Sequence, residues 1–216
     1  MSIGGKMKRL NIAVLIGVIG LSMTCVGCQN NSSPATTNEA SNNVMENNES
    51  DKKETVAEKS AKLIATLFTL DAPFTQATWG STIDEIIQTE GPVASTYKSI
   101  YGGTTYVINK TYENVDGTVK YMFDDKDALM CVAFTYVPNT AEEVTTLYNK
   151  LHSQLVDSLG KSEYQAEHDT NYGDVWYREE GDIVIGCMVT EEQNSLQYSY
   201  LNPIVSKYQM EAAAAQ

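Results

Sequence analysis

The sequence predicts an α+β domain over residues 79–203, built as an antiparallel sheet with helices packed on one face. Two observations support this class. Two segments carry apolar residues at helical spacing between a capping signal and a terminal glycine. Each is followed by short runs of strand-like residues, and these runs are joined by turns too short for the crossover that parallel strands need.

The first predicted helix begins just after Trp79-Gly80 and ends at Gly91-Pro92, where glycine and proline stop helical hydrogen bonding. Two overlapping capping boxes can start it: Ser81 with Asp84, and Thr82 with Glu85. Three strands are predicted next, at residues 106–112, 118–123 and 128–137. Asp116-Gly117 predicts the hairpin turn between the first two.

The second predicted helix starts at a Thr140–Glu143 capping box and ends at Gly160. Its apolar stripe consists of Val144, Leu147, Tyr148, Leu151, Leu155 and Leu159. Three further strands are predicted at residues 174–179, 182–190 and 195–201. The order suggests a duplicated helix–three-strand unit; convergent α+β patterning is the alternative.

The first 27 residues are typical of a bacterial export signal. Lys6, Lys8 and Arg9 form a positively charged region, and the apolar stretch that follows, residues 10–23, is 14 residues long. That length is short of the roughly 20 residues of a membrane-spanning helix.

Gly27 directly precedes Cys28, and the segment resembles a lipoprotein signal, in which the cysteine receives lipid and becomes the mature N-terminus. It departs from that pattern at Cys25, where leucine is usual. An ordinary signal peptide cut nearby, or an uncleaved anchor, is the alternative. We expect the protein to be held by lipid on Cys28 at the extracytoplasmic face of the cell membrane.

Three flanking segments complete the predicted organisation. Residues 28–53 are rich in Asn, Ser, Thr and Glu and are predicted to be a disordered tether. Residues 54–72 have mostly helical apolar spacing and are predicted to form a helix or stalk. Residues 204–216 are predicted to be a C-terminal tail.

The formal net charge of −13 argues against nucleic acid as a partner, because phosphate binding needs clustered Lys and Arg. Solubility explains the acidity more simply than an acidic binding face does. Cys131 and Cys187 both lie in apolar strand-like runs. They are either a disulfide, which export permits, or two buried free thiols.

The pattern of Trp79-Gly80-Ser81, Glu85-Ile86, Gly91-Pro92 and Leu159-Gly160-Lys161, with a meander between, resembles bacterial envelope lipoproteins of the SmpA/OmlA-like or β-lactamase-inhibitor-protein-like class. The resemblance covers about residues 79–203. It implies a helix-on-sheet domain that binds other proteins and is not an enzyme. No binding residue of that class can be carried over to this chain.

No catalytic, metal-binding or cofactor-binding motif stands out, so we expect no enzymatic activity and no cofactor. His152 is predicted at the edge of the apolar stripe, in a structural role, and His168 in a solvated acidic loop. The acidic run at residues 124–127 is predicted to be a turn, because it is too short for a calcium loop. Acidic pairs at residues 142–143 and 179–180 are predicted at a helix start and at a turn.

Seven tyrosines are predicted on strands: Tyr106, Tyr112, Tyr121, Tyr136, Tyr177, Tyr198 and Tyr200. They form either an exposed binding face, for protein or for glycan by ring stacking, or packing against the helices. The leading hypothesis is a lipid-anchored, non-catalytic interaction module with a protein partner in the envelope. An inhibitor of a wall-modifying or secreted enzyme, or a cell-surface hydrolase, is the alternative.

Overall fold

The computed structural model describes residues 67–168 and 171–205. The predicted signal segment, Cys28, the tether and the tail from residue 206 onward lie outside these residues, as does most of the predicted helix at 54–72. Among the described residues, no helix combines the length and apolar character that a membrane span requires.

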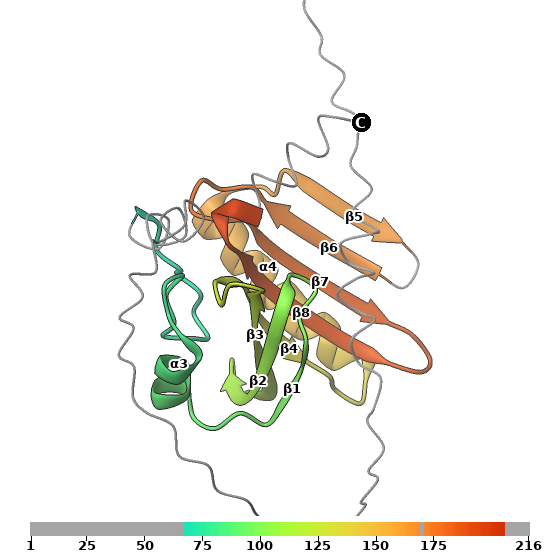
Figure 1. Ribbon diagram of the computed structural model, residues 1–216. Helices are drawn as coiled ribbons and strands as arrows, with labels where there is room; N and C mark the ends of the chain where they lie inside the picture. Colours follow the sequence, from blue (N-terminus) through green and yellow to red (C-terminus); the bar gives the residue numbers. More distant parts are fainter. Residues whose placement is uncertain (1–66, 169–170, 206–216) are drawn as a thin grey trace, which may run out of the picture.

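The fold is α+β, as predicted, with one antiparallel sheet of eight strands (Figure 1). Each half of the domain is a helix followed by four strands. The first half comprises α3 (Ile83–Glu90), β1 (Ser95–Lys98), β2 (Gly102–Tyr112), β3 (Val115–Asp124) and β4 (Leu129–Tyr136). The second comprises α4 (Ala141–Leu159), β5 (Tyr164–His168), β6 (Asn171–Trp176), β7 (Ile183–Val189) and β8 (Asn194–Leu201).

The strand order, β1-β2-β3-β4-β8-β7-β6-β5, places the two halves symmetrically about the β4–β8 pair. A duplicated unit produces this arrangement. Each unit contains four strands, so the predicted number of three strands per unit is wrong. The strands that the sequence did not reveal, β1 and β5, are the two edges of the sheet. An edge strand pairs on one side only and tolerates polar residues on both faces, so its hydrophobic alternation is weak.

The turn of the β2–β3 hairpin lies at Glu113-Asn114, where φ is +54° and +63°, and the predicted turn at Asp116-Gly117 is wrong. Two positive φ angles in a two-residue turn match the twist of a hairpin. Gly117 sits within β3, opposite Lys110. A Cβ there would lie 2.6 Å from Cζ of Phe134, so this glycine serves close packing and not a turn.

Both helices begin at predicted capping boxes. In α3 the box is Thr82 with Glu85, one of the two predicted pairs, and in α4 it is Thr140 with Glu143. Helix α4 packs against β7 and β8 (Figure 1). It buries Val144, Leu147, Tyr148, Leu151 and Leu155, which are five of the six predicted stripe residues.

The main core lies between the sheet and the helices. Helix α3 fully buries only Ile86, so it covers little of its half of the sheet. The remaining area is covered by residues 68–79, which we call the strap. Its buried side chains are Leu70, Ala72, Phe74, Ala77 and Trp79. We call the opposite side of the sheet, away from α3 and α4, the outer face.

Candidate functional site

A groove of about 420 Å³ opens at the beginning of α4, beside the β2–β3 hairpin. Its lining is Glu113, Val115, Tyr136, Thr140, Glu142, Glu143, Thr146, Leu147 and Lys150. The apolar and aromatic members are Val115, Tyr136 and Leu147. The charged members are three glutamates and one lysine. We call this the acidic groove.

The capping box holds the α4 end of the acidic groove. Glu143 N donates to Thr140 Oγ1 at 3.3 Å, and Thr140 N donates to Glu143 Oε2 at 3.1 Å. Glu142 is exposed and forms no ion pair with a described residue. The glutamate pair therefore sits at a helix start, as predicted, where the positive end of the helix dipole stabilises acidic groups.

The hairpin side of the acidic groove is fixed by an ion pair between Glu113 and Lys150. Gln154 Nε2 also donates to Glu113 Oε1 at 3.3 Å. The hydrogen bond from Lys150 lowers the pKa of Glu113 below its usual value. Because Lys150, the cationic residue of the lining, is engaged by Glu113, no cationic side chain of the groove is paired with Glu142 or Glu143.

Of the two alternatives for the tyrosines, an exposed binding face or packing against the helices, the structure supports packing. Tyr121, Tyr198 and Tyr200 are 0%, 3% and 8% exposed, and Tyr106, Tyr112 and Tyr136 pack against the same core. Tyr177 follows the end of β6 and is partly exposed. The six strand tyrosines share the side of the sheet that the helices and the strap cover. Only Tyr136 lines the acidic groove.

Cys131 and Cys187 are buried free thiols, so the possible disulfide is excluded. Cys131 lies on β4 and Cys187 on β7, with β8 between them. Two strand spacings amount to about 10 Å, beyond the reach of a disulfide. Cys131 packs on the outer face with Met122, whereas Cys187 belongs to the main core.

Asp174 is the centre of a buried polar network under α4 that the sequence analysis missed. Tyr148 Oη donates to Asp174 Oδ2. Ser162 Oγ and Gln165 Nε2 donate to Asp174 Oδ1 at 2.6 and 2.9 Å. His152 Nε2 lies 3.5 Å from Oδ2, and its ring stacks on Tyr148. The network lies under α4 and shares no residue with the acidic groove. This position fits the structural role predicted for His152.

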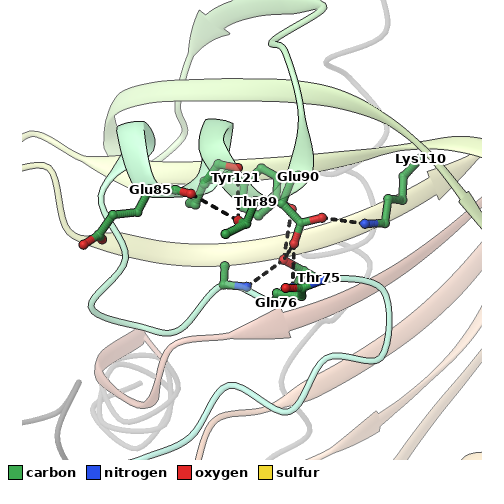
Figure 2. A network of polar contacts seen from close by, with 9 residues as sticks. Thr75, Gln76, Glu85, Thr89, Glu90, Lys110 and Tyr121 are labelled. Atoms are coloured by element: carbon green, nitrogen blue, oxygen red, sulfur yellow. Dashed lines mark hydrogen bonds and ion pairs between the residues drawn. The ribbon is translucent and has the colours of Figure 1, made fainter.

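Glu90, the last residue of α3, forms a second buried network (Figure 2). Its side chain has no exposed surface. Thr75 Oγ1 and Gln76 N donate to its Oε1 at 2.8 and 2.5 Å, and Lys110 Nζ donates to its Oε2 at 2.5 Å. Burial alone would raise the pKa of Glu90, but the hydrogen bonds from Lys110, Gln76 and Thr75 outweigh it and lower the pKa. This carboxylate fastens the strap to β2.

Two other predicted regions are placed by the structure. Asp124 Oδ1 accepts hydrogen bonds from Lys126 N and Ala128 N, both at 2.9 Å, so the acidic run after β3 is a turn, as predicted. The backbone of His168 ends strand β5, so the loop predicted there is wrong. Within residues 67–168 and 171–205, no three His, Cys, Asp or Glu side chains gather in a way that could hold a metal ion.

Comparisons with protein-family models, with curated proteins and with solved structures each find no match for this chain. The resemblance to envelope lipoproteins therefore stays an expectation from the sequence, and the functional argument below rests on the groove itself.

Proposed function

We propose that this protein is a lipid-anchored, extracytoplasmic interaction module whose domain holds a basic segment of a protein partner in the acidic groove. The observation that carries the proposal is the composition of that groove. Apolar and aromatic side chains lie among its lining, and two glutamates without a cationic partner stand beside them. The proposal assigns no catalytic step to the domain.

A lysine or arginine side chain fits this composition. Its aliphatic stem would pack on Val115, Leu147 and the ring of Tyr136, as long cationic side chains do on apolar surface. Its charge would lie near Glu142 and Glu143 at the start of α4. A chain with net charge −13 also attracts a basic partner over distance, so association should be faster at low salt.

The membrane part of the proposal rests on Lys6, Lys8 and Arg9, the short apolar stretch, and Cys28 after Gly27. The chain carries few Lys and Arg after this segment, so a basic patch would not hold it on anionic lipid. Two acyl chains on Cys28 would suffice, because each buried methylene contributes about 0.8 kcal/mol. Cys28→Ala should release the protein from the membrane or leave an unprocessed precursor.

The test is affinity capture from cross-linked native envelopes, with the full lipidated protein as bait. Glu142→Lys is the groove variant. Glu192→Lys, at an exposed acid in the turn before β8, is the matched control for charge reversal. Cys28→Ala controls for the anchor.

We expect one dominant partner. Its affinity should fall about tenfold, or roughly 1.4 kcal/mol, with Glu142→Lys and stay unchanged with Glu192→Lys. Raising the salt concentration should weaken capture by the wild-type protein. Equal capture by Glu142→Lys and wild type would contradict the acidic groove as the binding site. The absence of any saturable partner would contradict the function as an interaction module.

A further inference from the structure

A second groove of about 420 Å³ crosses β2, β3 and β4 at the hairpin end of the sheet. The residues of this groove that matter here are Asn109, Thr111, Asp116, Thr118, Thr135 and Val137. Because alternate strand residues point to opposite faces, Asn109, Thr118 and Thr135 lie on the outer face, whereas Val119 and Phe134 face the main core. We call this the outer groove.

Polar side chains form a row across the floor of the outer groove. Asn109 is paired with Thr118, Thr118 with Thr135, and Thr135 with Gln197 of β8. Neighbouring members of the row are therefore one strand spacing apart, about 4.8 Å. The row continues the outer face from the first half of the domain into the second.

Thr135 has an unsatisfied hydroxyl. Its side chain is 2% exposed, and Oγ1 has no hydrogen-bond partner among the described residues. A buried polar atom without a partner lowers stability, and a valine of the same shape would avoid that cost. Because Thr135 also lines the outer groove, a group that binds there could supply the missing hydrogen bond.

Of the charged groups that line the outer groove, Lys110 is paired with Glu90, whereas Asp116 is exposed and keeps its negative charge, which disfavours an anionic ligand. Lys110 Nζ donates to Glu90 at 2.5 Å, and Thr111 Oγ1 donates to Asp116 Oδ1 at 2.6 Å. What remains for a ligand is the amide of Asn109 and the hydroxyls of Thr118 and Thr135, which both donate and accept. Val137, at the rim, is 52% exposed and offers an apolar surface.

We propose that the outer groove binds a neutral saccharide unit of a glycan chain. Sugar hydroxyls both donate and accept, as the groove side chains do, and the C–H face of a pyranose ring packs on an aliphatic surface such as Val137. The volume lies within the range of small-ligand sites. The spacing of the row is close to the length of one pyranose in a linear chain. This inference does not depend on the acidic groove, which lies beside α4.

Calorimetric titration of the full-length protein, in a detergent without a sugar head group, tests the proposal. The probes are tri-N-acetylchitotriose and maltotriose, two neutral trisaccharides with and without acetamide groups. Thr135→Val removes the buried hydroxyl and keeps the shape of the side chain. Asn109→Ala changes an exposed side chain, so it tests the groove even if Thr135→Val perturbs folding. Thr96→Val, on the exposed strand β1, is the matched control.

Saturable binding of either trisaccharide by the wild-type protein is expected. Thr135→Val should weaken it at least about tenfold, as the loss of a buried hydrogen bond does, while the unfolding midpoint stays equal or rises. Asn109→Ala should weaken it several-fold, and Thr96→Val should bind like wild type. The absence of heat with both probes, or equal affinity in Thr135→Val and wild type, would overturn the proposal.

Discussion

We predict that replacing one carboxylate oxygen of Glu90 substantially lowers the free energy of unfolding of the domain. In Glu90→Gln the shape is kept, but one carboxylate oxygen becomes an NH₂ group. Thr75 and Gln76 both use Oε1 of Glu90, whereas Lys110 uses Oε2. The amide can keep its oxygen toward the strap only by turning its NH₂ group toward the ammonium of Lys110.

The loss is at least one charge-assisted hydrogen bond, about 1.5–3 kcal/mol, together with two donors that face each other where the Glu90 side chain has no exposed surface. We expect Glu90→Gln to lower the free energy of unfolding by about 2–4 kcal/mol. Urea unfolding followed by tryptophan fluorescence measures this, because both Trp79 and Trp176 are buried. Glu192→Gln, at an exposed acid, is the control and should stay within about 0.5 kcal/mol of wild type.

The pH dependence gives a second measurement on the same residue. Glu90 has a lowered pKa in the folded protein, so its contribution is fully present above the pKa of an unfolded glutamate. That contribution is lost as the pH falls through the folded pKa. The stability of wild type should therefore fall more steeply than that of Glu90→Gln between about pH 5 and pH 3. Equal midpoints in urea, or equal slopes with pH, would refute the assignment of Glu90 as the fastener of the strap.

The remaining predictions concern the second network, the thiols and the hairpin. Asp174→Asn should destabilise the domain by about 1–3 kcal/mol in the same urea assay, because the hydrogen bonds to a charged carboxylate become hydrogen bonds to a neutral amide and the Tyr148 hydroxyl must turn to accept from the new NH₂ group; a change below about 0.5 kcal/mol would contradict the network. Cys131 and Cys187 should resist a thiol reagent until the protein unfolds, because burial raises the pKa of each to about 12; rapid labelling of both in the native state would contradict their burial. Gly117→Ala should cost about 1–3 kcal/mol, because the added Cβ would lie 2.5 Å from the backbone oxygen of Thr135 and 2.6 Å from the Phe134 ring, and an unchanged unfolding midpoint would contradict this close packing.

The sequence predicted those parts of the fold that depend on local chemistry. The box of Thr140 with Glu143 and the glycine that ends α4 each act within a few residues, so their meaning does not depend on the rest of the chain. The outcome for the tyrosines shows the limit of such patterns. Alternation shows that Tyr198 and Tyr200 share a face, but it does not show whether that face meets water or a helix.

The candidate sites depend on residues that the fold brings together. Glu113 and Lys150 are 37 positions apart and meet only because the hairpin reaches α4. The buried residues Leu70, Ala72 and Phe74 of the strap alternate with exposed ones, but the prediction of a helix or stalk over residues 54–72 hid this pattern. Asp174 was the one buried centre with a usable signal, because an acid stands between two aromatic residues, Tyr172 and Trp176, that face the core.

The position of the strap determines how the domain responds to a force applied at the amino-terminal end of the chain. The Phe74 ring lies 5.3–6.0 Å from the rings of Tyr112, Phe134, Tyr198 and Tyr200, which belong to β2, β4 and β8. A pull on the chain before residue 67 therefore reaches strands of both halves before it reaches the edge strand β1. Such a load must first pull the Phe74 ring out of the core, whereas a chain attached directly at β1 would act on the edge of the sheet without that anchor.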